Sequence, residues 1–200
     1  ISKTEGTLTV TAVTDKVTVT ITENSGSEKY DGSEKTVTGY TVSIDNELYS
    51  ESDFRFSGDA TIKGTDAGSY DMELKASDFT NTSKNFTNVE FKIVDGTLNI
   101  SKRTVTLTSA TDSKTYDGKA LTNDEVTVGG DGFAKGEGAT YDVTGTQTEQ
   151  GTSANAFTYT LNDGTKADNY TITTVEGTLK VTAVTDKVTV TITENSGSEK

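Results

Sequence analysis

Apolar and polar residues alternate along most of the chain with a period of two. Val17, Val19 and Ile21 alternate with threonines, and the same pattern recurs several times further along. A period of two places one face of a strand against a core and leaves the other face in water, which is typical of antiparallel sheets. Threonine suits the wet face because its branched side chain fits the pleat and its hydroxyl stays solvated. Further strands are predicted at 70–74, 89–93, 105–107, 157–161 and 179–181.

Helices are almost absent from this prediction, because no window sustains a period of 3.6 residues. A single helical turn is allowed near residues 51–54 or 121–125. Pairs of Gly with Asn or Asp supply the turns between strands. They lie at 24–26, 31–32, 66–68, 95–96, 117–118 and 162–164, and a Glu-Gly pair at 176–177 supplies one further turn. We therefore expect small antiparallel β-sandwich domains of the immunoglobulin-like type, arranged end to end, with a β-grasp-like sheet as the alternative.

The chain also repeats itself at two levels. Residues 5–29 match residues 176–200 at 24 of 25 positions, at an offset of 171 residues. Within this period the triplet Tyr-Asp-Gly at 30–32 recurs at 116–118, 86 residues on. We infer two diverged repeats that alternate in a longer array. The predicted segments are 1–14, the last strand of a preceding repeat; 15–101, the first repeat; 102–185, the second repeat; and 186–200, the first strand of a following one.

The amino-acid composition limits the kinds of functional site and partner that the chain can have. The chain has 41 threonines but no Cys, His, Pro or Trp. It therefore lacks the residues for disulfides, thiolate or imidazole metal sites and a Ser-His-Asp triad, and we expect no enzyme activity and no cofactor. The net charge of −13 disfavours nucleic acid and anionic membranes as partners. No apolar run approaches about 18 residues, so no membrane span is expected in this segment.

Several motifs carry a resemblance to a known family. The second repeat has KTYDGK at 114–119, NYTI at 169–172 and EGTLKV at 176–181. The first repeat keeps KYDG at 29–32, GTDAGSY at 64–70 and DGTL at 95–98. It departs at 88–91, where it has NVEF in place of NYTI. In this order the motifs resemble the MBG/YDG-type tandem repeat domains of large bacterial cell-surface, adhesin-like proteins.

The resemblance implies an exported parent protein attached to the bacterial cell wall, with such repeats serving as stalk units and carrying no catalytic residues. We therefore expect a stalk or spacer that projects a distal domain from the cell. It would be a monomeric rod whose partners are neighbouring repeats of the same chain. The alternative is a repeat that binds host glycans, mucin or surface proteins weakly and gains avidity from copy number.

Exposed aromatic residues would favour the binding alternative. Most Tyr and Phe residues fit the inward phase of a strand, whereas Phe133 and Tyr49, with Phe79 and Phe86, do not. Phe133 and Tyr49 are therefore the candidate ligand contacts. Phe133 also lies in the glycine-rich loop at 129–138, which is the candidate binding loop of the second repeat.

The recurring triplets are interpreted as a folding motif. The Tyr ring would dock on the edge of the core, the Asp would hydrogen-bond the backbone two residues on, and the Gly would adopt a positive φ. The structural motif residues are Tyr30, Asp31, Gly32, Tyr116, Asp117, Gly118, Asn169 and Tyr170.

Two groups of acidic residues could in principle bind calcium. They are Asp15 with Glu23 and Glu28, and Asp131 with Glu137 and Asp142. The sequence contains no DxDxDG loop, and calcium needs six to eight converging oxygens, so we interpret both groups as solvated surface and expect no metal.

Overall fold

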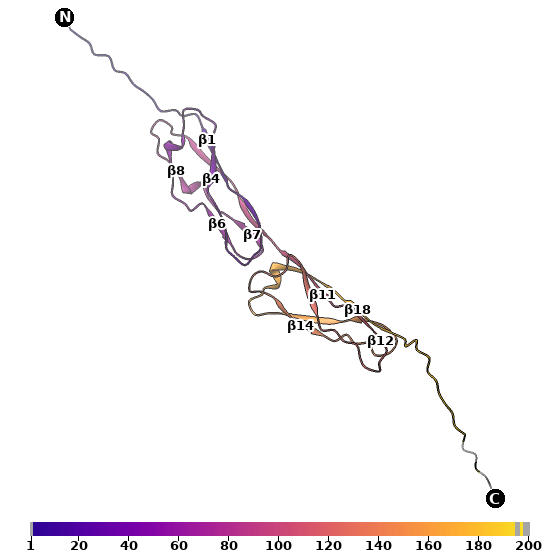
Figure 1. Cartoon of the computed structure of the whole chain (residues 1–200). Coiled ribbons are helices and arrows are strands. Elements are labelled where there is room, and N and C mark those ends of the chain that lie inside the picture. Colours follow the sequence, from indigo (N-terminus) through magenta and orange to yellow (C-terminus); the bar gives the residue numbers. More distant parts are fainter. Residues whose placement is uncertain (1, 195–196, 198–200) are drawn as a thin grey trace. The chain divides into compact units, whose positions relative to one another are not determined.

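The structure is a computed structural model that describes residues 2–194 and 197. Across this part of the chain, regular structure consists of β-strands and single 3-10 turns, without an α-helix, so the predicted all-β class is confirmed. The chain forms two compact units (Figure 1). The first consists of Ile1–Thr104, Phe133–Glu137 and Lys166–Thr171, and the second of Val105–Gly132, Gly138–Thr165 and Ile172–Lys200.

Two three-stranded sheets and two strand pairs build the first unit. In the three-stranded sheets, β1 (Val17–Glu23) lies between β4 (Tyr40–Ile44) and β9 (Val89–Val94), and β10 (Thr97–Ser101) lies between β2 (Gly26–Lys29) and β7 (Gly68–Asp71). The pairs are β3 (Lys35–Thr38) with β6 (Thr61–Gly64), and β5 (Phe54–Phe56) with β8 (Phe79–Asn81). The 3-10 turns η1 (Glu51–Asp53) and η2 (Ala76–Asp78) precede β5 and β8.

The strands from the second repeat follow a similar order. Here β11 (Arg103–Ser109) lies between β13 (Val126–Gly130) and β17 (Tyr170–Val175), and β18 (Gly177–Thr182) lies between β12 (Asp112–Thr115) and β15 (Gly151–Asn155). β14 (Ala139–Val143) pairs with β16 (Phe157–Leu161), and the turn η3 (Ala167–Asn169) precedes β17. The helical turn allowed near 51–54 is present as η1, whereas residues 121–125 form no helix.

Strand pairing is mixed, so the prediction of purely antiparallel sheets is wrong. β1 runs parallel to β9, β2 parallel to β10, and β12 parallel to β18, while β1 and β4 are antiparallel. Alternating residues indicate which face of a strand is buried, but they do not indicate the direction of its neighbour. The direction is set by the long connections that return the chain to the sheet.

Two predicted turns instead carry the chain between sheets. At 24–25 the chain passes from β1 into β2, and at 95–96 it passes from β9 into β10, in each case entering a different sheet. The two crossings touch each other. A Cβ on Gly96 would lie 2.4 Å from the carbonyl oxygen of Asn24, so only glycine fits here.

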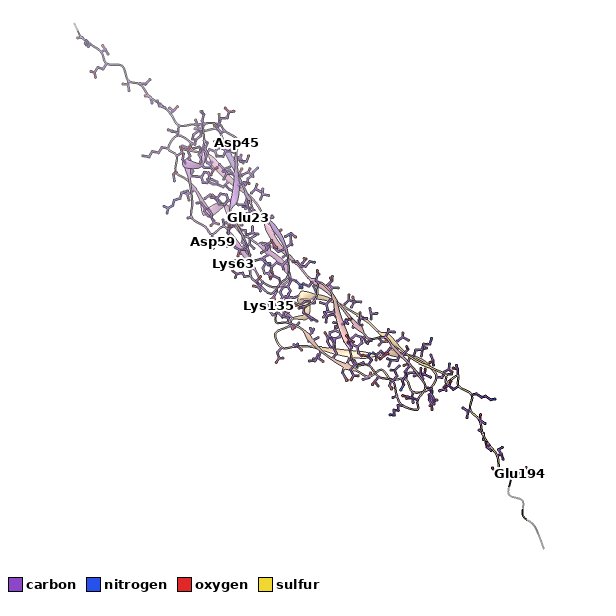
Figure 2. The ribbon with its side chains drawn as sticks, viewed as in Figure 1. Glu23, Asp45, Asp59, Lys63, Lys135 and Glu194 are labelled. Atoms are coloured by element: carbon purple, nitrogen blue, oxygen red, sulfur yellow. The ribbon has the colours of Figure 1, made fainter. Side chains whose placement is uncertain are left out.

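Glu23 joins these crossings through its buried carboxylate. The residue is 3% exposed, and Figure 2 shows it at the end of β1. Its Oε2 accepts a hydrogen bond from the Gly96 amide (2.7 Å), and its Oε1 accepts one from the Leu74 amide (2.8 Å). Burial of a carboxylate requires such partners. The interpretation of Glu23 as solvated surface is therefore wrong.

In the second repeat, Ser109 occupies the position beside β18 that Glu23 occupies beside β10 in the first repeat, and Asn155 lies next to it. Ser109 Oγ accepts a hydrogen bond from the Gly177 amide (2.9 Å) and donates one to the carbonyl of Asn155 (2.6 Å). Asn155 Nδ2 donates to the carbonyls of Ala110 (3.0 Å) and Asn123 (2.8 Å). The two repeats thus satisfy the same backbone amide with different side chains.

An aromatic cluster fills much of the first unit. Tyr49, Phe79 and Phe86 are only 3–5% exposed, so the expectation that they face outward is wrong. They lie in or beside loops and short 3-10 turns, where the period of two no longer reports which way a side chain points. The cluster consists of Tyr40, Tyr49, Phe54, Phe56, Phe79, Phe86 and Phe91, linked by edge-to-face and stacked contacts.

Residues 187–194 repeat the sequence of 16–23 but contain no strand. Val188, Val190 and Ile192 are 76–85% exposed, whereas the same side chains in β1 are fully buried. In β1 the backbone is paired on both sides, by β4 and β9. The rest of the predicted following strand, residues 195–196 and 198–200, lies outside the described residues.

We predict that Glu23→Gln destabilises the first unit by about 1–3 kcal/mol. The amide retains one acceptor oxygen, but its NH2 group would face the backbone N–H of Leu74 or Gly96. Urea unfolding followed by circular dichroism measures the change. Glu28→Gln is the matched control, because Glu28 is exposed and the charge change is the same. Equal stability of the two variants would contradict the role given to Glu23.

Candidate functional site

The candidate site surrounds Tyr30, and we call it the Tyr30 cluster. It consists of Tyr30, Asp66, Glu137, Asn169 and Tyr170, all within the first compact unit. Tyr30 follows β2, Asp66 precedes β7, and the other three come from Phe133–Glu137 and Lys166–Thr171. Segments remote in sequence therefore meet at one turn.

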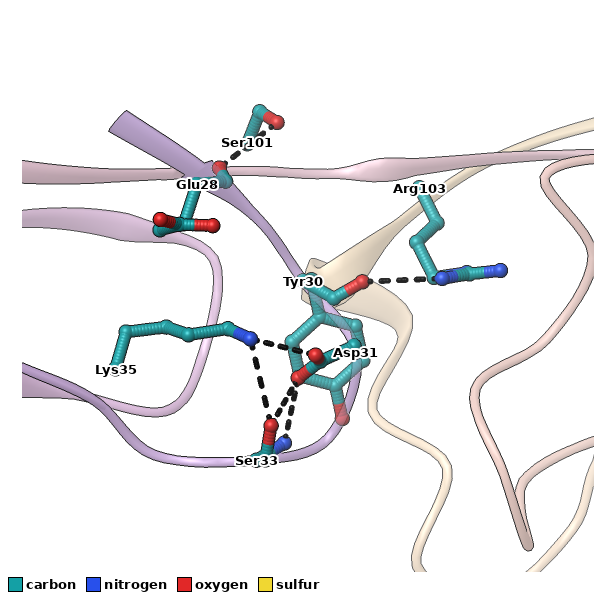
Figure 3. Close-up of polar contacts among 7 residues, drawn as sticks. All are labelled: Glu28, Tyr30, Asp31, Ser33, Lys35, Ser101 and Arg103. Carbon is teal, nitrogen blue, oxygen red and sulfur yellow. Dashed lines mark hydrogen bonds and ion pairs between the residues drawn. The ribbon is translucent and has the colours of Figure 1, made fainter. Parts of the chain in front are cut away.

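The turn itself has the predicted local geometry (Figure 3). Asp31 Oδ1 accepts a hydrogen bond from the amide of Ser33, two residues on (2.9 Å), and Gly32 has a φ of 82°. Lys35 Nζ lies 2.5 Å from Asp31 Oδ2. The hydrogen bond from Lys35, aided by those from Ser33, holds the pKa of the Asp31 carboxyl far below its ordinary value.

The turn at 116–118 has the same local backbone geometry as the turn at 30–32. Asp117 Oδ1 accepts hydrogen bonds from the Lys119 amide (3.0 Å) and from Lys114 Nζ (2.7 Å), and Gly118 has a φ of 74°. The hydrogen bond from Lys114 lowers the pKa of Asp117. The expected Asp bond and positive φ are therefore present in both copies.

The two tyrosines differ sharply in burial. Tyr30 is 4% exposed and Tyr116 is 39% exposed, so the expectation that each ring docks on the core edge is wrong for Tyr116. The Tyr30 hydroxyl donates to Glu137 Oε1, and the Tyr170 hydroxyl donates to Glu137 Oε2 (2.8 Å). The rings of Tyr30 and Tyr170 meet edge to face, with centroids 5.7 Å apart. One carboxylate thus bridges two phenols.

Asn169 anchors the other side of the cluster. It is fully buried, its Oδ1 accepts a hydrogen bond from the Ala67 amide (2.7 Å), and its Nδ2 donates to Asp66 Oδ1 (3.0 Å). Lys166 Nζ lies 2.6 Å from Asp66 Oδ2. The hydrogen bond between Lys166 and Asp66 lowers the pKa of Asp66 and raises the pKa of Lys166.

The two candidate ligand contacts lie in different places. Phe133 is half-buried, and its ring meets the Tyr170 ring edge to face, with the two ring centroids 5.2 Å apart. Tyr49 lies in the aromatic cluster, with its hydroxyl 3.0 Å from Asn81 Oδ1. The structure therefore brings Phe133, Asn169 and Tyr170 to Tyr30, while Tyr49 stays inside the core.

Sequence reasoning did not connect Glu137 or Asp66 with the turn. The grouping with Asp131 and Asp142 as solvated surface is wrong for Glu137, which binds Tyr170 and also Tyr30, 107 positions away in sequence. Asp66 was interpreted only as a turn residue. No periodicity or motif signals a pairing over such distances.

The chemistry of the cluster is that of hydrogen-bond donors held in place. Burial, then the hydrogen bond to Glu137, raises the pKa of Tyr30 to about 12. Burial also raises the pKa of Tyr170. A tyrosine hydroxyl is protonated at neutral pH even at its ordinary pKa of about 10, so each phenol donates to the shared carboxylate, and the raised pKa values extend this to higher pH.

A hollow of about 360 Å³ lies elsewhere, lined by Asp71, Glu73, Asp95 and Thr97. Glu73 has a φ of 61°, an unusual value for a residue with a side chain. Within residues 2–194 and 197, no three His, Cys, Asp or Glu side chains are grouped as metal ligands. In the same range, no helix is long and apolar enough to cross a membrane.

We predict that the protein loses stability between pH 10 and 12. The folded-state pKa of Tyr30 lies above its ordinary value of 10, so its contribution is complete below pH 10 and is lost as the pH rises through about 12. Tyr30→Phe should reduce this alkaline loss while lowering stability at neutral pH by about 1–2 kcal/mol, because Glu137 loses a donor.

Denaturant unfolding at a series of pH values, with phenolate absorbance recorded in parallel, measures both effects. Tyr159→Phe is the control, because Tyr159 is 36% exposed. An alkaline loss of the same size in the Tyr30→Phe and Tyr159→Phe variants would contradict the prediction.

Comparison with known protein families identifies one family that contains several of these features. A family model described as the MBG domain matches residues 3–102, half of the chain. The match includes Glu23, both crossings and the Tyr30 turn. Searches of curated proteins and of solved structures return no match. The family match confirms the resemblance found in the motifs, and the chain belongs to the MBG domain family.

Proposed function

We propose that the chain is a structural segment of a stalk, which spaces a distal domain of a bacterial adhesin away from the cell. The observation that carries the proposal is the recurrence of 24 of 25 residues at an offset of 171. Near-identical recurrence suits a spacer whose length changes with the number of copies. The match to the MBG domain, a repeat domain of surface proteins, supports the same assignment.

The join between repeats also favours a spacer. β10 ends at Ser101 and β11 begins at Arg103, so Lys102 alone separates the two strands. A single residue cannot act as a flexible tether. Tension applied to the chain would pass from the last strand of one repeat into the first strand of the next.

Our proposal includes location and finer architecture. The parent protein would be extracellular and attached to the cell wall, as the resemblance implies. Each repeat would be a small immunoglobulin-like β-sandwich within an end-to-end monomeric rod, with a β-grasp-like sheet as the alternative. Three-stranded sheets joined by continuous crossing chains support the sandwich.

We predict that small-angle X-ray scattering will show the maximum dimension rising linearly with the number of 171-residue periods. With about 3.3 Å per strand residue, each period of two repeats should add about 70–90 Å. A variant with a flexible Gly/Ser insertion at Lys102 is the control and should gain less per period. Growth that falls off with copy number in the unmodified chain, as in a flexible string of beads, would contradict the stalk.

Weak binding of glycans or mucin is the second candidate function. The observation that favours it is an aromatic pair on β14 and β16, where Tyr141 lies opposite Tyr159 and Tyr159 is 36% exposed. An exposed ring can stack on a sugar face while its hydroxyl stays hydrated.

If binding is the function, mucin pull-down by a multi-copy chain should fall several-fold with Tyr159→Ala. It should change little with Thr160→Ala, a substitution on the opposite face of the same strand. Equal pull-down by the unmodified chain and by a chain of scrambled sequence would exclude this function.

A further inference from the structure

The turn at 116–118 has the geometry of a docked turn but lacks the cover that the turn at 30–32 has. The Tyr30 turn is covered by the segment Phe133–Glu137, which supplies Glu137 to the hydroxyl and Ala134 to the glycine. A Cβ on Gly32 would lie 3.7 Å from Ala134 Cβ, so the segment packs directly on this glycine. Ala134 is 5% exposed as a result.

The first repeat contains a counterpart of the covering segment. The offset of 86 residues that relates the two Tyr-Asp-Gly turns also relates β4 to β13 and residues 45–51 to 131–137. It places Leu48 at the position of Ala134 and Glu51 at the position of Glu137. Leu48 is 79% exposed here, and Glu51 is also exposed.

We propose that the Tyr116 turn is a docking surface for the next repeat, and that its occupant is the segment 45–51 of a further copy of the first repeat. Tyr116 donates a hydrogen bond to Glu51 of that copy, and Leu48 packs on Gly118. The inference rests on the tandem array of the proposed function. The occupant follows from the sequence, because residues 186–200 repeat residues 15–29 and so begin a new copy of the first repeat.

Chain spacing agrees with this pairing. Tyr30 and Glu137 are 107 residues apart. One period of 171 residues beyond Glu51, the next copy of that glutamate lies 106 residues after Tyr116. The connection available to the proposed contact is therefore one residue shorter than the connection already observed.

A second contact shows how the chain would enter the next copy. The amide of Val13 donates to the Asn85 carbonyl (2.7 Å), and Val13 forms a bridge with Phe86. Val184 occupies the position of Val13 in the following period and is 48% exposed. In an extended array Val184 would meet the next copies of Asn85 and Phe86, close in sequence to Val89.

One difference marks the proposed contact. The offset of 81 residues between the NYTI and NVEF motifs puts Val89 at the position of Tyr170. Tyr116 would therefore meet an aliphatic side chain rather than a second phenol. Glu51 would accept one tyrosine hydrogen bond where Glu137 accepts two.

The proposal is tested by nitrating the tyrosines and measuring the extent of nitration at each one by peptide mass spectrometry. The 200-residue chain is compared with a chain extended by one 171-residue period, in which the second Tyr116 is changed to Phe so that only the first reports. We expect Tyr116 to react about as readily as Tyr159 in the 200-residue chain, and several-fold less in the longer chain. Tyr159 should react equally in both and is the internal control.

Variants in the added copy identify the covering segment. Leu48→Asp should restore the reactivity of Tyr116, and Glu51→Gln should restore part of it. Glu125→Gln is the charge-matched control and should leave Tyr116 protected, because Glu125 is exposed in the other repeat. Equal reactivity of Tyr116 in the short and long chains, or protection that survives Leu48→Asp, overturns the proposal.

Small-angle X-ray scattering on the same two chains distinguishes a failure of the docking contact from a failure of the proposed stalk. A reactive Tyr116 in a chain whose length still rises by the expected increment overturns the docking contact and leaves the stalk in place. A protected Tyr116 that Leu48→Asp exposes supports docking whatever increment is measured.

Discussion

The fold depends on one hydrogen-bond acceptor placed where two backbone segments cross between sheets. Gly96 and Gly177 approach the opposing backbone so closely that their amides are removed from water. An amide buried without a partner costs about as much as a hydrogen bond is worth, so each crossing needs an acceptor at that point. Glu23 supplies it in one repeat and Ser109 in the other. The acceptor can change its chemistry because geometry, rather than charge, is what the crossing requires.

The strands themselves were largely predictable, because each needs only a local pattern. Val17, Val19 and Ile21 are buried as their spacing predicts. The crossings were not, since Asp-Gly and Asn-Ser favour turns equally whether the chain reverses or continues into another sheet. The parallel register of β1 and β9 was hidden for a related reason, because their partnership is decided by the chain between them. Glu23 continues the buried phase of Val17, Val19 and Ile21, and it was misjudged because a carboxylate is expected in water until its amide donors are located.

Nearly identical sequences adopt different structures in different surroundings, which shows that local sequence alone does not determine each strand. Leu179 and Val181 are buried in β18, while their counterparts Leu8 and Val10 are about 90% exposed. A threonine-rich ribbon has few apolar side chains, so burial of one face does not by itself offset the entropy of ordering the backbone. Neighbouring strands must supply the missing hydrogen bonds. Each repeat is therefore stabilised by pairing across long stretches of sequence.

The same reasoning explains why the candidate site was only half predictable. The local part of each Tyr-Asp-Gly turn, with its Asp bond and its positive φ, follows from three adjacent residues and is present in both copies. The remaining part is supplied by a distant segment, so Tyr30 and Tyr116 differ in burial although their turns agree. A turn that is rigid before it meets its partner loses little entropy on docking. Recurrence of the motif therefore reflects a preformed donor, and the residues that receive it must be sought one repeat further along the chain.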